Sequence, residues 1–275
     1  MKETPKNLYL ELIKKNLVFS LWPEPLLPAE TFNYKRPFIK RYIIKIASRI
    51  LKAFQLHLGE KRIITERDKE EGYDFPISAV TMIGHKRLNN IQYCVQTALD
   101  DKIPGDLIEA GVWRGGACLF MKAILTSNNI NNRKVFLADS FAGLPKPEAD
   151  KYPADKGEEY YKEKFLAVSK EEVENNFRKF DLLDDNIIFL KGWFKDTLPT
   201  APIEKLSVMR LDGDMYGSTM DSLENLYPKL SAGGFCIIDD YALEGCKKAV
   251  DDYRERNNID SEIITIDWTG VYWRK

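Results

Sequence analysis

The second part of the chain alternates short apolar runs with helical segments, and this alternation constrains the fold more than any other feature. Buried strands of a parallel sheet are near-continuous apolar runs, and a strand–helix–strand order joins parallel neighbours. The pattern predicts an α/β fold with a doubly wound, mostly parallel, seven-stranded sheet that ends in an antiparallel hairpin. The expected strands are residues 107–112, 134–139, 186–191, 206–211, 233–239, 262–266 and 270–273, with helices near 117–125, 170–180, 219–227 and 245–256.

The first hundred residues have a mainly helical pattern. A helix is expected over residues 7–21, where the prolines of 22–25 end it, and another begins at His85 and runs through Thr97. Residues 37–58 form an amphipathic segment with no acidic residue before Glu60. Its apolar positions are Phe38, Ile39, Tyr42, Ile43, Ile46, Ile50 and Phe54, and its basic residues are Lys35, Arg36, Lys40, Arg41, Lys45, Arg49 and Lys52.

Three hypotheses remain open for this basic segment. It packs as a helix that covers the domain or contacts a second subunit, or residues 35–58 lie on an anionic membrane surface, or they recognise an acidic or phosphorylated substrate. A membrane contact would point to a lipid-linked or cell-surface glycan as the acceptor.

Composition and charge narrow the classes of function. The chain has 275 residues, and its net charge of −1 gives no global reason to expect a nucleic-acid partner. Its four cysteines are scattered without a CxxC pair, so neither a disulfide framework nor a zinc–thiolate site is indicated. Two histidines exclude histidine-rich metal chemistry. The N-terminus lacks a signal-peptide pattern, and no stretch approaches the ~18 apolar residues of a membrane span, so a cytoplasmic protein is expected.

Four aspartates follow two neighbouring strands of the predicted sheet. Asp212 and Asp214 come after the fourth apolar run, and Asp239 and Asp240 come after the fifth. The carboxyl ends of parallel strands share one edge, where open α/β sheets bind their ligands. Carboxylates meeting there repel one another unless a cation or shared protons compensate. Oxygen ligands suit a hard ion such as Mg2+ better than zinc.

A second set of features predicts a nucleoside ligand. The glycine-rich turn EAGVWRGG, residues 109–116, joins the first strand to a helix, but it matches neither GxGxxG nor a phosphate-binding loop with lysine. Asp139 ends the second strand, where such folds bind ribose hydroxyls, and Trp193 follows the third. Together they suit an adenosine ligand without phosphates, and S-adenosylmethionine fits that description.

At this point the chain resembles the macrocin-type sugar O-methyltransferases, which act on deoxysugars of macrolide and aminocoumarin antibiotics. The resemblance covers roughly residues 65–275. It is carried by TMIG with RL (81–84, 87–88), EAGVWRGG (109–116), ADSFAGLP (138–145), GWFKDTLP (192–199), LDGDMYGST (211–219), IIDDY (237–241) and IDWTGVYWRK (266–275).

The resemblance implies a class I methyltransferase fold, S-adenosylmethionine as methyl donor and a divalent metal, usually Mg2+. By motif, the metal ligands would be Asp212, Asp239 and Asp240, and Asp214 would be the general base, although the division between base and ligand stays open. The implied donor contacts are Thr81, Met82, Glu109, Ala110, Gly111, Asp139, Ser140, Gly192, Trp193, Phe194 and Asp212. The family also implies assembly into homo-oligomers. We expect residues 1–75 to form a helical lid or oligomerisation region and residues 76–275 the methyltransferase domain.

The expected reaction is methylation of a sugar hydroxyl in a glycosylated natural product or glycan. A metal would stabilise the developing alkoxide while Asp214 accepts its proton. Residues 146–170 are expected to form a mobile loop over the site, with Tyr152, Tyr160 and Tyr161 as candidate sugar contacts.

Three alternatives remain. They are a catechol-type O-methyltransferase acting on an aromatic diol, a binding module without catalysis, and a phosphotransferase, against which the missing phosphate-binding loop counts.

Overall fold

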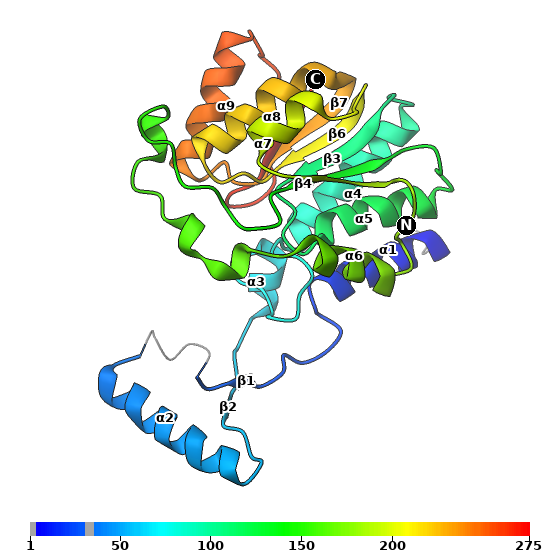
Figure 1. Cartoon of the computed structure of the whole chain (residues 1–275). Coiled ribbons are helices and arrows are strands. Elements are labelled where there is room, and N and C mark those ends of the chain that lie inside the picture. The colour runs from blue at the N-terminus through cyan, green and yellow to red at the C-terminus, as the bar shows by residue number, and fades with distance from the viewer. Residues whose placement is uncertain (1–3, 31–35) are drawn as a thin grey trace.

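The computed structural model describes residues 4–30 and 36–275, and its centre is a seven-stranded sheet (Figure 1). Its strands are β3 (Asp106–Ala110), β4 (Val135–Asp139), β5 (Ile187–Lys191), β6 (Leu206–Leu211), β7 (Leu230–Ile238), β8 (Ile264–Thr265) and β9 (Val271–Arg274). They lie in the order β5-β4-β3-β6-β7-β9-β8. The five from β5 to β7 are parallel, whereas β9 is antiparallel to β7 and β8. The predicted α/β sheet and its closing hairpin are confirmed.

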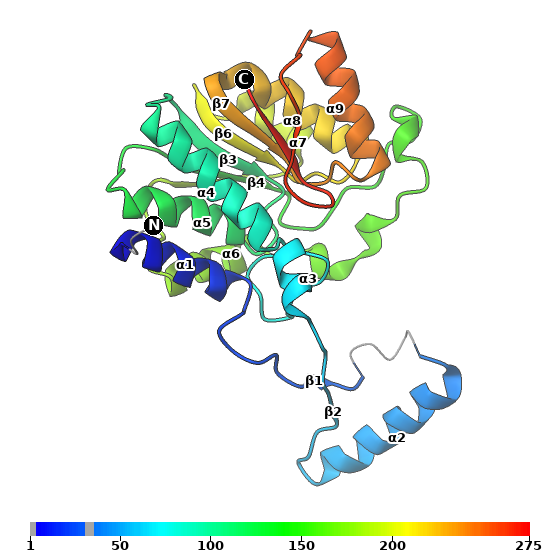
Figure 2. The same ribbon diagram turned by 180° about the vertical axis from the view of Figure 1, so that it is seen from behind.

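Helices cover both faces of the sheet (Figure 2). One layer consists of α1 (Pro5–Leu17), α4 (His85–Asp100), α5 (Gly116–Ser127) and α6 (Lys170–Lys179), and the other of α7 (Phe194–Thr197), α8 (Tyr216–Leu226) and α9 (Glu244–Arg256). Side chains alternate between two buried cores because successive residues of a strand face opposite sides. Leu107 of β3 therefore packs in the core with α4 and α5, while its neighbour Ile108 packs in the core with α8 and α9.

Local sequence accounts for where several helices begin. Ser169 caps α6, because its hydroxyl accepts a hydrogen bond from the Glu172 N–H. Thr65 and Asp68 form a reciprocal capping box at α3 (Glu66–Glu71). Short 3-10 turns interrupt the loops at Pro153–Asp155, Tyr160–Lys162, Lys164–Leu166, Leu198–Thr200 and Tyr227–Lys229.

Helix α1 belongs to the body of the domain rather than to a separate N-terminal region. Leu10 and Leu17 are fully buried in the same core as α4 and α5. The boundary expected at residue 75 therefore does not follow the packing of the chain. The helix is also shorter than the predicted 7–21, because Phe19 has a left-handed backbone with φ 56°.

The basic segment forms α2 (Phe38–Ala53), which stands apart from the body on an arm that contains β1 (Leu27–Pro28) and β2 (Gly59–Glu60) (Figures 1 and 2). The helix covers most of the amphipathic segment 37–58 and ends at Ala53, before the turn at Gln55, which has φ 58°. Lys35, part of the predicted basic set, lies outside the described residues. Across residues 4–30 and 36–275, no helix is long and apolar enough to cross a membrane.

Candidate active site

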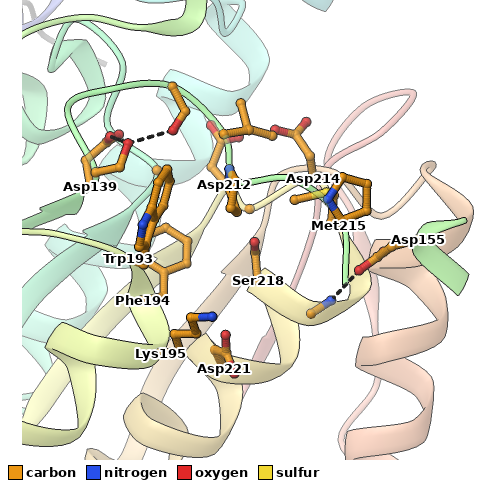
Figure 3. A pocket seen from close by; sticks show the side chains of 18 of the residues that line it. Asp139, Asp155, Trp193, Phe194, Lys195, Asp212, Asp214, Met215, Ser218 and Asp221 are labelled. Carbon is orange, nitrogen blue, oxygen red and sulfur yellow. Dashed lines mark hydrogen bonds between the residues drawn. The ribbon is translucent and has the colours of Figure 1, made fainter. Parts of the chain in front are cut away.

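A cavity lies at the carboxyl edge of the parallel strands, where the loops after β3, β4, β5 and β6 meet (Figure 3). Residues 146–168, which we call the lid segment, line part of this cavity. The lining residues of the lid segment lie between Lys146 and Asp155 and at Leu166. The predicted site residues on the wall are Met82, Gly111, Asp139, Ser140, Gly192, Trp193, Phe194, Asp212 and Asp214. The structure thus brings together predicted residues from five segments that are distant in sequence.

The glycine turn after β3 permits a close approach of two strand ends. Gly111 has φ 93°, and a Cβ at this position would overlap the carbonyl oxygen of Asp212. The Asp212 N–H donates to the Ala110 carbonyl at 2.8 Å, which extends the pairing of β3 and β6 beyond their last residues. Only glycine fits such a contact without strain. The glycine turn therefore determines how closely the loop after β3 approaches the aspartates after β6.

Asp139 is held rigidly at the end of β4. One carboxyl oxygen accepts the Val112 N–H at 2.7 Å and the other accepts the Phe141 N–H at 2.7 Å. Burial raises the pKa of this carboxyl, and the two backbone donors oppose the shift. Each oxygen keeps a further lone pair. The side chain can therefore accept hydrogen bonds from a pair of hydroxyl groups in the cavity.

Aromatic side chains form the wall next to Asp139. Trp193 and Phe194 follow β5, and their rings lie beside each other between Asp139 and Lys195 (Figure 3). Lys195 pairs with Glu148 of the lid segment at 2.5 Å. Flat apolar rings next to a hydroxyl-binding carboxylate are suited to a base and a ribose. This half of the cavity has the shape and polarity of a nucleoside site.

Asp212 and Asp214 lie on the other half of the cavity wall, and Asp240 lies close to both. Asp212, Asp214 and Asp240 each present a carboxyl oxygen within 4.8 Å of the others. Asp214 has φ 56°, and its N–H donates to Asp240 Oδ2 at 3.1 Å. Burial and the neighbouring carboxylates raise the pKa of Asp214 to about 7 and the pKa of Asp240 well above its usual range. All-oxygen donors crowded in this way fit a hard divalent cation.

Asp239 is placed differently from the other three. It forms ion pairs with Arg87 and with Arg210, and the Arg210 Nη2 lies 2.5 Å from Asp239 Oδ1. Although burial alone would raise its pKa, the two guanidinium groups hold the pKa of Asp239 below its usual value. The expected ligand set of Asp212, Asp239 and Asp240 thus differs from the observed cluster in one member.

The same arginines extend a buried charge network behind the cavity. Arg210 also pairs with Glu109 and lies 3.0 Å from Asp212, and Arg87 also pairs with Asp267 at 2.8 Å. Together, this network and the aspartate cluster contain two guanidinium groups and six carboxyl groups. The surplus of negative charge is a second reason why the site suits a cation.

Three residues that were predicted to contact S-adenosylmethionine do not lie on the cavity wall. Glu109 is buried behind the glycine turn, where it pairs with Arg210 and accepts the Cys118 N–H at 3.1 Å. Ala110 is buried in β3, and Thr81 is buried against the start of α5. Because their side chains pack behind the wall, these residues support its shape rather than facing the cavity.

Several residues of the cavity wall could not be recognised as site residues from the sequence. Asp155 of the lid segment is buried, and its carboxylate accepts the backbone N–H groups of Tyr216 and Gly217 (Figure 3). Met215, Ser218 and Asp221 also face the cavity from α8 or the turn before it. Of the three candidate tyrosines, Tyr152 lies on the wall, whereas Tyr160 and Tyr161 do not. Asp155 looked like any other charge in a Lys- and Glu-rich loop, and its role depends on a contact 61 residues away.

Comparison with known proteins identifies the family. The profile of the macrocin-O-methyltransferase (TylF) family matches residues 6–275, including the N-terminal region in which no motif was evident. Mycinamicin III 3''-O-methyltransferase from Micromonospora griseorubida is 52% identical over 213 residues, which is 76% of this chain and 84% of that protein.

A second relative spans the whole chain. The 8-demethyl-8-(2,3-dimethoxy-alpha-L-rhamnosyl)-tetracenomycin-C 4'-O-methyltransferase from Streptomyces olivaceus is 45% identical over 276 residues, covering 100% of this chain and 95% of that protein. The solved structure of the O-methyltransferase NovP superposes with a TM-score of 0.83 at 44% identity, covering 98% of this chain and 99% of that one. The chain therefore belongs to the macrocin-O-methyltransferase family and is an O-methyltransferase with the class I fold.

Proposed function

We propose that the protein transfers a methyl group from S-adenosylmethionine to a hydroxyl of a sugar in a glycosylated natural product or glycan. The observation that carries the proposal is the meeting, in one cavity, of a nucleoside-shaped half and an aspartate cluster. The names of the relatives support the sugar acceptor, because two of them are described as methylating mycinamicin III and a rhamnosyl tetracenomycin.

The donor is proposed to lie along the glycine turn. Asp139 would accept the ribose hydroxyls, and Trp193 and Phe194 would contact the adenine. Met82 and Gly111 lie on the same wall and would contact the amino-acid part of the donor. This arrangement would point the methyl group toward the half of the cavity that holds Asp212 and Asp214.

A divalent cation such as Mg2+ is proposed as the partner of the aspartates. By motif Asp212, Asp239 and Asp240 would hold it, and Asp212 and Asp240 also belong to the observed carboxylate cluster. When bound, such an ion supplies positive charge that stabilises a sugar alkoxide as it develops. Two adjacent sugar hydroxyls fit the open side of such a site, so a vicinal diol is the expected acceptor.

Asp214 is proposed to accept the proton of the sugar hydroxyl. It lies on the cavity wall at the turn between β6 and α8, within reach of a group held against Asp212. The backbone at Asp214 is held by the hydrogen bond from its N–H to Asp240 Oδ2. Methyl transfer then needs the acceptor oxygen about 3 Å from the methyl carbon and in line with the bond that breaks.

In a second division of roles, Asp214 replaces Asp239 as a metal ligand. Asp214 belongs to the observed cluster, and both oxygens of Asp239 are already near guanidinium groups. In that arrangement Asp214 would be a ligand and another group would accept the proton. Homo-oligomer assembly and a cytoplasmic location stay predictions.

Acceptor screening tests the proposed function. Purified protein would be incubated with labelled S-adenosylmethionine and either deoxyhexose glycosides with vicinal hydroxyls or catechols, before and after removal of divalent ions by a chelator. We expect label on the sugar, lost on chelation and restored by Mg2+. Transfer to a catechol but to no sugar diol would replace the proposal with the aromatic acceptor. Donor binding without turnover on either class would indicate a non-catalytic module.

A further inference from the structure

Helix α2 presents a large apolar face to solvent. Six large apolar side chains of the helix, Phe38, Ile39, Tyr42, Ile43, Ile46 and Ile50, are between 43% and 80% exposed. At 3.6 residues per turn they share an arc of about 140°. Ser48 is the one buried side chain of the helix. A contiguous exposed patch of this kind marks an interaction surface rather than ordinary surface scatter.

Positive charge borders this face on both sides. On the helical wheel, Lys45 lies just outside Phe38 at one edge, Arg49 lies between Phe38 and Tyr42, and Lys40 lies beyond Ile43 at the other edge. No acidic residue occurs between Arg36 and Gly59. Long basic side chains at such edges can extend their charged ends toward water or anionic groups while their stems stay on apolar surface.

This charge pattern favours one partner over another. Two copies of the helix packed face to face would bring their basic edges together, and like charges at close range oppose that pairing. An anionic lipid surface instead offers negative charge at the edges and an apolar layer at the centre. The helix is 16 residues long, and its polar edges suit a position in the plane of the interface.

We propose that this face of α2 docks onto the surface of a bilayer containing anionic phospholipid. The arm places helix α2 away from the sheet (Figures 1 and 2), so docking of this helix would leave the methyltransferase body outside the bilayer. Docking would present the enzyme to acceptors carried on a membrane. The proposal is independent of which sugar is methylated.

Vesicle flotation with the full chain tests the proposal. Wild-type protein would be mixed with vesicles of neutral phosphatidylcholine or of phosphatidylcholine with phosphatidylglycerol. Two double variants address the two features of the face, Ile43→Asp with Ile46→Asp and Lys40→Glu with Lys45→Glu. The matched control reverses two exposed lysines on the body, Lys15→Glu with Lys179→Glu.

We expect the wild type to float with the anionic vesicles and to be released by high salt. Because each basic residue near an anionic surface contributes about 1 kcal/mol, the lysine reversal should reduce the partition coefficient at least about tenfold. The isoleucine variant should lose flotation, and the control should retain it. Methyltransferase activity on a free acceptor should stay at the wild-type level in all three, because α2 contributes no residue to the cavity wall.

Two results would overturn the proposal. One is wild-type protein that stays at the bottom of the gradient with anionic vesicles, or that floats equally well with neutral ones. The other is a dimer in light scattering that the isoleucine variant converts to a monomer while vesicle binding is absent. That second result would assign the face to another copy of this chain.

Discussion

Asp155 of the lid segment caps helix α8 through the backbone of Tyr216. Its Oδ1 accepts the Tyr216 N–H at 2.6 Å, and its Oδ2 accepts the Gly217 N–H at 2.9 Å. Helix α8 has no side-chain cap of its own, since Met215 precedes it. A carboxylate at a helix N-terminus satisfies free N–H groups and interacts favourably with the helix dipole. The lid is thus attached to the helix that follows Asp214.

Replacing Asp155 should loosen the lid. Asp155→Ala leaves two buried N–H groups without an acceptor, so we expect a stability loss of about 1–2 kcal/mol and faster tryptic cleavage within residues 146–168. The KM for the sugar acceptor should rise more than kcat falls, and Asp155→Asn should be intermediate. Asp150→Ala, at an exposed position in the same loop, is the control. Equal cleavage rates and KM values in Asp155→Ala and wild type would refute the attachment.

Gly111 should tolerate no side chain. An alanine there adopts a left-handed backbone and its Cβ overlaps the Asp212 carbonyl, so the ends of β3 and β6 must separate. Gly157 has a similar φ of 95°, but a Cβ added there would meet no atom within 4 Å. Gly157→Ala therefore measures only the cost of the left-handed backbone, about 1–2 kcal/mol. We expect Gly111→Ala to lose clearly more free energy of unfolding than Gly157→Ala in urea titrations. Similar losses would show that the close contact is unimportant.

Arg210 should be essential for stability. Removing it by Arg210→Met leaves Glu109 and Asp239 buried without their shared guanidinium, and breaking a buried pair of this kind costs about 3–5 kcal/mol. Arg178→Met removes an exposed pair with Glu174 and should cost under about 1 kcal/mol. Chemical denaturation of both variants measures the difference. Adding Glu109→Gln to Arg210→Met should recover part of the loss, and no recovery would contradict the network.

Trp193 should contribute to donor binding. Aromatic stacking on a base is worth about 1–3 kcal/mol, so Trp193→Ala is expected to weaken S-adenosylhomocysteine binding roughly tenfold or more in calorimetry. Trp22→Ala removes an exposed tryptophan that is absent from the cavity wall and should leave the affinity unchanged. Unchanged affinity in Trp193→Ala would move the adenine away from this wall.

Local pattern was sufficient for most of the sheet. The runs at 187–191 and 206–211 are apolar along most of their length, as strands covered by helices on both faces must be, and their predicted bounds lie within one residue of β5 and β6. The glycine turn and Asp139 were found because they lie at strand ends. Strand ends are placed by the sheet itself, so sequence position converts directly into a place at the edge.

Features that depend on contacts between distant segments were not predictable in the same way. Arg210 lies in the middle of an apolar run, and nothing local indicates that it meets Arg87 of α4 around Asp239. That meeting separates Asp239 from the cluster formed by Asp212, Asp214 and Asp240. Asp155 likewise acquires its role through packing of the lid against α8.

The roles of the aspartates can be separated by titrating Mn2+ or Mg2+ into Asp212→Asn and Asp214→Asn in the presence of S-adenosylhomocysteine, alongside single-turnover methyl transfer to a sugar diol. Asp212→Asn is predicted to weaken metal binding. Asp214→Asn is predicted to bind the metal almost as wild type does but to slow transfer by about 10²–10⁴-fold, as loss of a general base does. Equal losses of metal affinity in the two variants would contradict the assignment of Asp214 as the base.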